Sequence, residues 1–132
     1  SGKPLLGICL GMQLLVDYSE EFGEHKGLGV IHGTASKFKP IDGSKVPHTG
    51  WNSIEIPTEN ESNFMDDPIL NEISPGKDCY FVHSFMVTVK HKINNIAETR
   101  YGGETFSSII RNDNVYGCQF HPEKSGAIGS KF

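Results

Sequence analysis

The 132-residue chain has few cysteines, little positive charge and no long apolar run, and each shortage excludes a class of protein. Three cysteines without paired spacing do not make a disulfide framework, so we expect a reducing, cytoplasmic location. A net charge of −4 leaves no basic surface for nucleic acid. No apolar run reaches the roughly 18–20 residues that span a bilayer, and no signal peptide is visible, so no membrane partner is expected. The composition is that of one modest soluble domain.

The two ends of the chain look like internal positions of a longer protein. Residue 1 is Ser1 rather than methionine, and an apolar segment follows almost at once. The last residue, Phe132, comes shortly after a glycine-containing turn. We therefore expect residues 1–132 to be part of a larger protein.

Hydrophobic patterning predicts an α/β opening and a strand-rich second half. Residues 4–9 form an unbroken apolar run, which is typical of a buried strand, and residues 10–19 carry apolar side chains at helical spacing. Residues 106–111 and 115–120 flank an Asn-Asp-Asn turn and so predict a hairpin. Other extended segments are expected at 28–38, 45–56, 79–89 and 95–101, with a short helix beginning near 66–68.

Residues 7–11, Gly-Ile-Cys-Leu-Gly, resemble a nucleophile elbow, a sharp turn between a strand and a helix. The helix N-terminus and a nearby imidazole would both favour the thiolate of Cys9. The flanking Gly7 and Gly11 permit the tight backbone, and the Leu10 N–H would point at a developing oxyanion. The alternative is an inert cysteine in an apolar strand.

His121 and Glu123 supply the other groups that covalent acyl transfer needs. Alternate residues of an extended segment share a face, so the carboxylate of Glu123 can orient the imidazole of His121. One alternative is a surface turn. Another is a zinc site, but two groups with no clear third ligand make a poor one, so we expect no metal and no cofactor.

Three further residues each have a functional and a structural interpretation. Gln13 lies one helical turn after Cys9 and either binds a substrate amide or points to solvent. His83 lies in a β-forming run, where a histidine is more often structural than catalytic. Trp51, the single tryptophan, either anchors the core or forms part of a docking surface. Cys79 and Cys118 are typical of small apolar strand residues.

Taken together, the segments Gly-Ile-Cys-Leu-Gly-Met-Gln, Lys-Val-Pro-His-Thr-Gly-Trp-Asn, Tyr-Phe-Val-His-Ser-Phe and Gln-Phe-His-Pro-Glu-Lys-Ser resemble the class I, triad-type glutamine amidotransferases. Within them the match is to glutaminase subunits that serve imidazole glycerol phosphate synthesis. The resemblance covers nearly the whole chain. It implies an α/β fold with an open, mostly parallel sheet flanked by helices and a flavodoxin-like core. It also implies that residues 1–132 lack the family's N-terminal strands and last helix.

The resemblance implies roles for individual residues. Cys9 would attack glutamine to form a γ-glutamyl thioester, His121 would transfer protons, and Glu123 would orient His121. Residues on the oxyanion and glutamine-binding side would be Leu10, Gly11, Gln13, His83, Ser84 and Phe85. Residues near a (β/α)8-barrel cyclase subunit, which receives the ammonia, would be Trp51, Tyr80 and Lys124.

The chain departs from the family pattern at three points. The glycine-rich loop that supplies the second oxyanion donor is missing together with the N-terminal strands, so we expect residues 1–132 alone to be inactive. Phe85 stands where a tyrosine is usual, which removes a hydroxyl group. The last helix is missing after residue 129.

Other functions remain open from the sequence. A paralogue that supplies ammonia for amino or amidino sugars of surface polysaccharides would have nearly the same glutaminase half. A non-catalytic binding subunit would be expected to lack Cys9, His121 or Glu123, and all three are present. A cysteine hydrolase or protease of related architecture would not need Gln13 or the docking segments.

Overall fold

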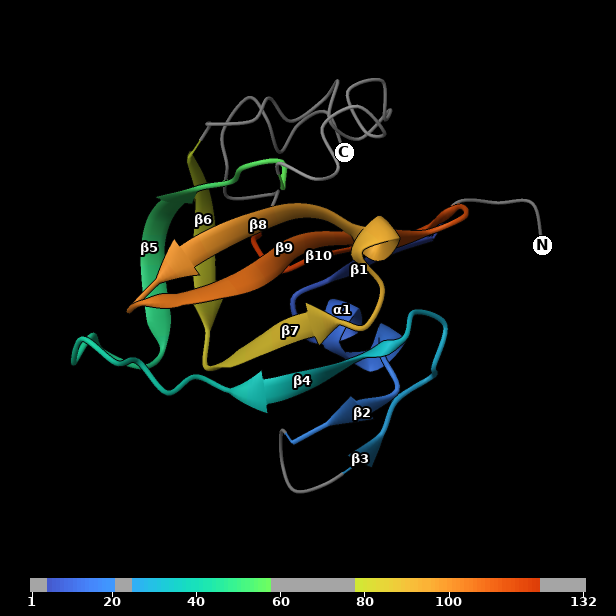
Figure 1. Cartoon of the computed structure of the whole chain (residues 1–132), viewed down its shortest axis with the longest axis horizontal. Coiled ribbons are helices and arrows are strands. Elements are labelled where there is room, and N and C mark those ends of the chain that lie inside the picture. The colour runs from blue at the N-terminus through green and yellow to red at the C-terminus, as the bar shows by residue number, and fades with distance from the viewer. Residues whose placement is uncertain (1–4, 21–24, 58–77, 122–132) are drawn as a thin grey trace.

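The computed structural model describes residues 5–20, 25–57 and 78–121, whose strands form two sheets (Figure 1). The elements of the first half are β1 (Leu5–Ile8), α1 (Leu10–Leu15), β2 (Tyr18–Ser19), β3 (His25–Lys26), β4 (Gly33–Lys37) and β5 (His48–Ser53). Those of the second half are β6 (Asp78–His83), β7 (Phe85–Val89), the 3-10 helix η2 (Lys92–Asn94), β8 (Asn95–Tyr101), β9 (Glu104–Asn112) and β10 (Val115–Cys118).

The main sheet of the described residues is mixed. Its strand order is β1-β10-β9-β7-β4-β2-β3, and β8 also pairs with β9. The pairs β1–β10 and β2–β4 are parallel, whereas the other strand pairs of this sheet in the described residues are antiparallel. In this part of the chain the sheet is therefore mixed rather than mostly parallel and has few helices, which is consistent with the expected α/β fold class. Here hairpins replace most of the crossover helices that parallel strands need.

Strands β5 and β6 form a separate antiparallel ribbon that crosses one end of the main sheet (Figure 1). His48 pairs with His83, and Trp51 pairs with Tyr80. Because side chains alternate along a strand, the two pairs project from opposite faces of the ribbon. One face therefore carries the histidines toward the core, and the other carries Trp51 outward.

Two hydrophobic clusters cover opposite faces of the main sheet. Adjacent residues Ile109 and Ile110 of β9 belong to different clusters, as the alternation of a strand requires. One cluster includes Phe81 of the ribbon, and the other includes Met12 of α1. The ribbon and α1 thus pack against opposite faces of the sheet.

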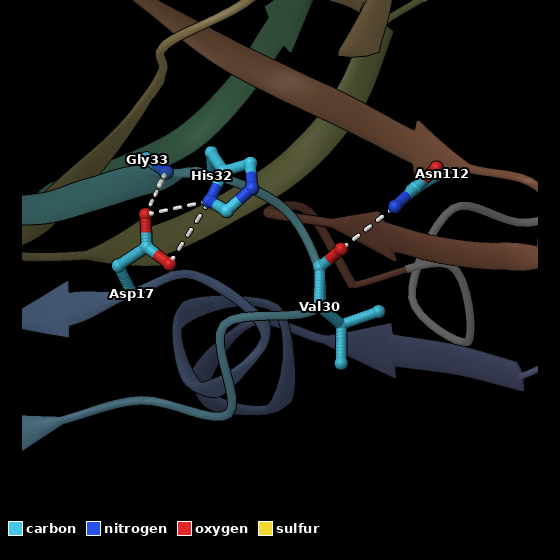
Figure 2. Close-up of polar contacts among 5 residues, drawn as sticks. All are labelled: Asp17, Val30, His32, Gly33 and Asn112. Carbon is cyan, nitrogen blue, oxygen red and sulfur yellow. Dashed lines mark hydrogen bonds and ion pairs between the residues drawn. The ribbon is translucent and has the colours of Figure 1, made fainter.

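Helix α1 has only six residues and would not be stable in isolation. Its C-terminal carbonyls are satisfied by the following loop: Leu28 N–H donates to Leu14 O, Ile31 N–H to Leu15 O, and Gly29 N–H to Val16 O. The Asp17 carboxylate accepts hydrogen bonds from His32 Nδ1 and Gly33 N, both at 3.2 Å, and Asn112 Nδ2 donates to Val30 O at 2.8 Å (Figure 2). The loop therefore anchors the end of α1 to the main sheet.

The predicted strand at residues 95–101 and the hairpin after it are confirmed by β8, β9 and β10. The predicted helix at 10–19 ends at Leu15, because Tyr18 and Ser19 pair with both β3 and β4. The predicted strand at 79–89 is divided at Ser84 into β6 and β7, which belong to different sheets. The helix expected near 66–68 lies outside the described residues. Where the chain is described, no helix is long and apolar enough to cross a membrane.

Candidate active site

Cys9 lies at the junction of β1 and α1, as the elbow motif predicts. Its φ is 53° and its ψ is −104°, a conformation that L-residues rarely adopt and that costs about 1–3 kcal/mol. The turn is held by Cys9 N–H, which donates to Cys118 O at 2.8 Å, and by Gln13 N–H, which donates to Cys9 O at 3.1 Å. A Cβ on Gly7 would lie 2.8 Å from the backbone of Gly11, so the close approach of strand and helix requires glycine there.

Strand β6 brings Cys9 and His121 to one edge, although the two residues are far apart in the sequence. The Sγ of Cys9 lies 3.8 Å from Val82 O, and His121 N–H donates to Tyr80 O at 2.8 Å. Carbonyls two residues apart point to the same edge of a strand. Parallel pairing of β1 with β10 contributes to this arrangement, because Ile8 is opposite Cys118, just before His121.

A pocket of about 260 Å³ lies directly at Cys9. It is lined by Cys9, Leu10, Gln13, Pro47, Val82, His83 and Ser84. Gln13 is only 3% exposed, so the alternative in which it points to solvent is wrong. Its buried Oε1 has no hydrogen-bond partner among the described residues. A buried acceptor in a pocket wall is suited to an N–H group of a bound molecule.

Gln119 is a site residue that sequence reasoning missed. Its side chain is fully buried, and its Nε2 donates to Cys9 Sγ at 3.5 Å. A hydrogen bond to a sulfur favours its charged form, so Gln119 favours the thiolate that a nucleophile needs. The available signal was its place two residues before His121, in the segment 115–120 that the sequence predicts to be a strand.

His83 is a buried member of the pocket wall, with 4% exposure. Burial, with smaller contributions from the neighbouring His48 and His121, lowers its pKa to about 4. The ring is therefore neutral at pH 7. Its Nδ1 lies 2.8 Å from the main-chain oxygen of Phe85, which fixes the turn around Ser84. The missing hydroxyl at Phe85 does not affect this contact, because it uses only the main chain.

Two of the residues expected at a docking surface, Trp51 and Tyr80, lie on the outer face of the β5–β6 ribbon. Trp51 is 57% exposed, so the alternative in which it anchors the core is wrong. Its ring and that of Tyr80 pack edge to face, with 5.5 Å between centroids. Glu123 and Lys124 lie outside the described residues.

The other two cysteines are apolar strand residues, as expected. Cys79 and Cys118 are fully buried. Burial, with a further contribution from the Asp78 carboxylate, raises the pKa of the Cys79 thiol to about 12, which makes it a poor nucleophile. In the described ranges no three His, Cys, Asp or Glu side chains are arranged to hold a metal ion.

Comparisons with known proteins show which proteins the chain is similar to. The chain is 46% identical to imidazole glycerol phosphate synthase subunit HisH 1 of Legionella pneumophila (strain Lens), covering 98% of the chain and 62% of that protein. It is 48% identical to subunit HisH of Lacticaseibacillus casei (strain BL23), covering 98% and 57%, and 44% identical to that of Salinibacter ruber, covering 97% and 57%. The chain thus spans roughly three fifths of the length of these relatives.

The fold has counterparts among solved structures. A glutamine amidotransferase from Thermotoga maritima superposes with a TM-score of 0.59 at 18% identity, covering 91% of the chain and 40% of that protein. Another glutamine amidotransferase superposes with a TM-score of 0.53 at 17% identity, covering 97% and 57%. These likenesses confirm the fold class. The model of the family "Glutamine amidotransferase class-I" matches residues 1–131, and the chain therefore belongs to the class-I glutamine amidotransferases.

Proposed function

We propose that the complete protein containing this chain is the glutaminase subunit of imidazole glycerol phosphate synthase and acts in histidine biosynthesis. The observation that carries the chemistry is the position of Cys9, which is held at positive φ in a pocket that also contains the buried Gln13. The pathway is supported by 44–48% identity to relatives named as HisH subunits of that synthase.

The reaction begins with attack of the Cys9 sulfur on the carboxamide carbon of glutamine. His121 accepts the thiol proton and returns a proton to the nitrogen as ammonia leaves, and a γ-glutamyl thioester remains. Water, deprotonated by His121, then attacks the thioester, releases glutamate and restores the thiol. Glu123 orients His121, and the N–H of Leu10 stabilises the oxyanion together with the neighbouring Gly11.

Substrate recognition is assigned to the pocket wall. Oε1 of Gln13 accepts an N–H group of glutamine, because it is buried and has no hydrogen-bond partner among the described residues. The turn formed by His83, Ser84 and Phe85 holds the substrate partly through its main chain. Both this turn, through His83 and Ser84, and α1, through Leu10 and Gln13, line the pocket.

The ammonia passes to a (β/α)8-barrel cyclase subunit in a heterodimer. The interface includes Trp51, Tyr80 and Lys124, of which Trp51 presents an exposed aromatic face. We assign the complex to the cytoplasm, where thiols such as Cys9 stay reduced.

The test is glutamine hydrolysis by the complete protein, alone and mixed with a histidine-pathway cyclase subunit and its nucleotide ligand. We expect strong stimulation by the mixture and loss of activity in Cys9→Ala. If Cys9→Ala hydrolysed glutamine at the wild-type rate, the assignment of Cys9 as the nucleophile would be overturned. If glutamine is hydrolysed but the cyclase does not stimulate the reaction, the glutaminase chemistry stands and the ammonia goes to another acceptor.

A further inference from the structure

Two buried histidines face each other across the β5–β6 ribbon, and the proposed chemistry does not use one of them. His48 and His83 are 3% and 4% exposed, and His48 Nδ1 lies 3.0 Å from His83 Nε2. Two neutral imidazoles in contact need one N–H and one lone pair between them. The position of the shared proton is therefore defined by what the outer nitrogens contact.

Both ends of the pair require the same proton arrangement. His83 Nδ1 lies 2.8 Å from Phe85 O, and a carbonyl only accepts, so Nδ1 carries the proton and Nε2 has the lone pair. His48 Nδ1 therefore donates to His83, which leaves a lone pair on His48 Nε2. That lone pair lies 3.4 Å from Asn52 Nδ2, which is a donor.

The orientation of the Asn52 amide is itself determined by the backbone. Its Oδ1 accepts from Ser53 N at 2.8 Å, and its Nδ2 donates to Arg100 O at 2.9 Å. The second N–H of the amide is thus directed at His48. The result is a chain of hydrogen bonds with one polarity, from Asn52 through His48 and His83 to Phe85 O.

Aromatic rings hold the pair in place and exclude water. The His48 ring is stacked between Tyr101, at 4.0 Å between centroids, and Phe81, at 5.0 Å. Among the described residues, the titratable groups near the pair are Tyr101 of β8, whose hydroxyl donates to Lys45 O, His121 beyond β10, and Cys9, which shares the pocket with His83. Burial lowers the pKa of both histidines to about 4.

We propose that His48 is a positioning residue for glutamine hydrolysis: by donating to His83 it keeps that ring neutral and holds the turn at residues 83–85 against Cys9. The inference rests on the proposed function. If His83 Nε2 gained a proton, His48 Nδ1 would have to accept it in a hydrogen bond, so His48 would carry its own proton on Nε2. That N–H would then face the Asn52 N–H, and two donors would oppose each other. The added proton would also place a positive ring beside His121 and weaken that residue as a base.

The experiment compares His48→Phe and His48→Asn in the complete protein with the cyclase subunit present. Phenylalanine keeps a stacked ring but removes the donor, whereas asparagine keeps a donor near the position of Nδ1. We expect His48→Phe to lower kcat/KM for glutamine about tenfold at pH 7. The acid limb of the pH profile of kcat/KM should move up by about one pH unit in this variant, because the pKa of His83 then lies closer to neutrality. His48→Asn should keep the wild-type limb.

Nitrogen NMR of the wild-type histidines tests the proton arrangement without any substitution. Both His48 and His83 should be Nδ1–H tautomers, and an Nε2–H tautomer of His83 would overturn the inference. If His48→Phe does not fold, Asn52→Ala should shift the acid limb the same way by a smaller amount. An unmoved limb in an active variant overturns the role of His48 alone, whereas a wild-type protein that does not hydrolyse glutamine overturns the proposed function as well.

Discussion

At the scale of single residues, the elbow depends on two glycines for different reasons. A Cβ on Gly7 would lie 2.8 Å from the carbonyl carbon and oxygen of Gly11 and 3.0 Å from Met12 N. These are backbone atoms, so they cannot rotate away as a side chain would. A Cβ on Gly11 would meet nothing within 4 Å. The motif contains both glycines, but only the packing of β1 on α1 shows which one is required.

Gly7→Ala and Gly11→Ala form a matched pair that tests this difference. We expect Gly7→Ala to lower the free energy of unfolding by about 1–3 kcal/mol, because backbone must shift to admit the methyl group. Gly11→Ala should raise it by about 0.5–1 kcal/mol, because alanine is favoured over glycine in a helix. Urea unfolding of the complete protein measures both. Equal effects of the two substitutions would contradict the close approach at Gly7.

At the scale of elements, the local sequence pattern predicts that strands exist better than it predicts where strands and helices end. The predicted hairpin after residue 105 is present because its turn residues and apolar strands are neighbours in sequence. The end of α1 at Leu15 and the break at Ser84 were not predictable in this way. Both depend on pairing with strands elsewhere in the chain, which no local pattern encodes.

The β5–β6 ribbon supplies a prediction about the proposed partner. Trp51→Ala should weaken cyclase binding or stimulation at least about tenfold, as truncation of a tryptophan hot spot does. Its free energy of unfolding should change by less than about 1 kcal/mol, because the side chain is mostly exposed. Binding by calorimetry and stimulation of glutamine hydrolysis are the measurements.

Ile93→Ala is the control, because Ile93 has the same 57% exposure as Trp51 but lies in η2, outside the ribbon. Ile93→Ala should change neither the response to the cyclase nor the free energy of unfolding. If Trp51→Ala destabilises the subunit as strongly as it weakens the response to the partner, the docking role of Trp51 is contradicted.

At the scale of the whole molecule, the buried histidine pair predicts a pH-dependent stability. His48 and His83 have pKa values lowered from 6.5 to about 4 in the folded chain, so the unfolded state binds protons first as pH falls. The free energy of unfolding should be constant above pH 6.5 and fall between pH 6.5 and 4. The slope is at most about 1.4 kcal/mol per pH unit for each histidine.

His48→Asn removes one of the two titrating rings, so about half of this slope should disappear. Urea unfolding at several pH values, with wild type and His48→Asn side by side, is the measurement. Identical pH dependence of the two proteins would show that the pKa of His48 in the folded chain is that of an exposed histidine.

The sequence by itself determined the family, the position of Cys9 between a strand and a helix, and most strands, because these depend on residues close together in the chain. Only the tertiary structure decided which side chains meet. Gln119 reaches Cys9 across a separation of 110 residues, and His48 reaches His83 across 35. Such contacts follow from strand register, and one residue of slip would turn each side chain to the other face. Polar and aromatic residues that look unremarkable in sequence therefore acquire their roles only from the pairing of distant strands.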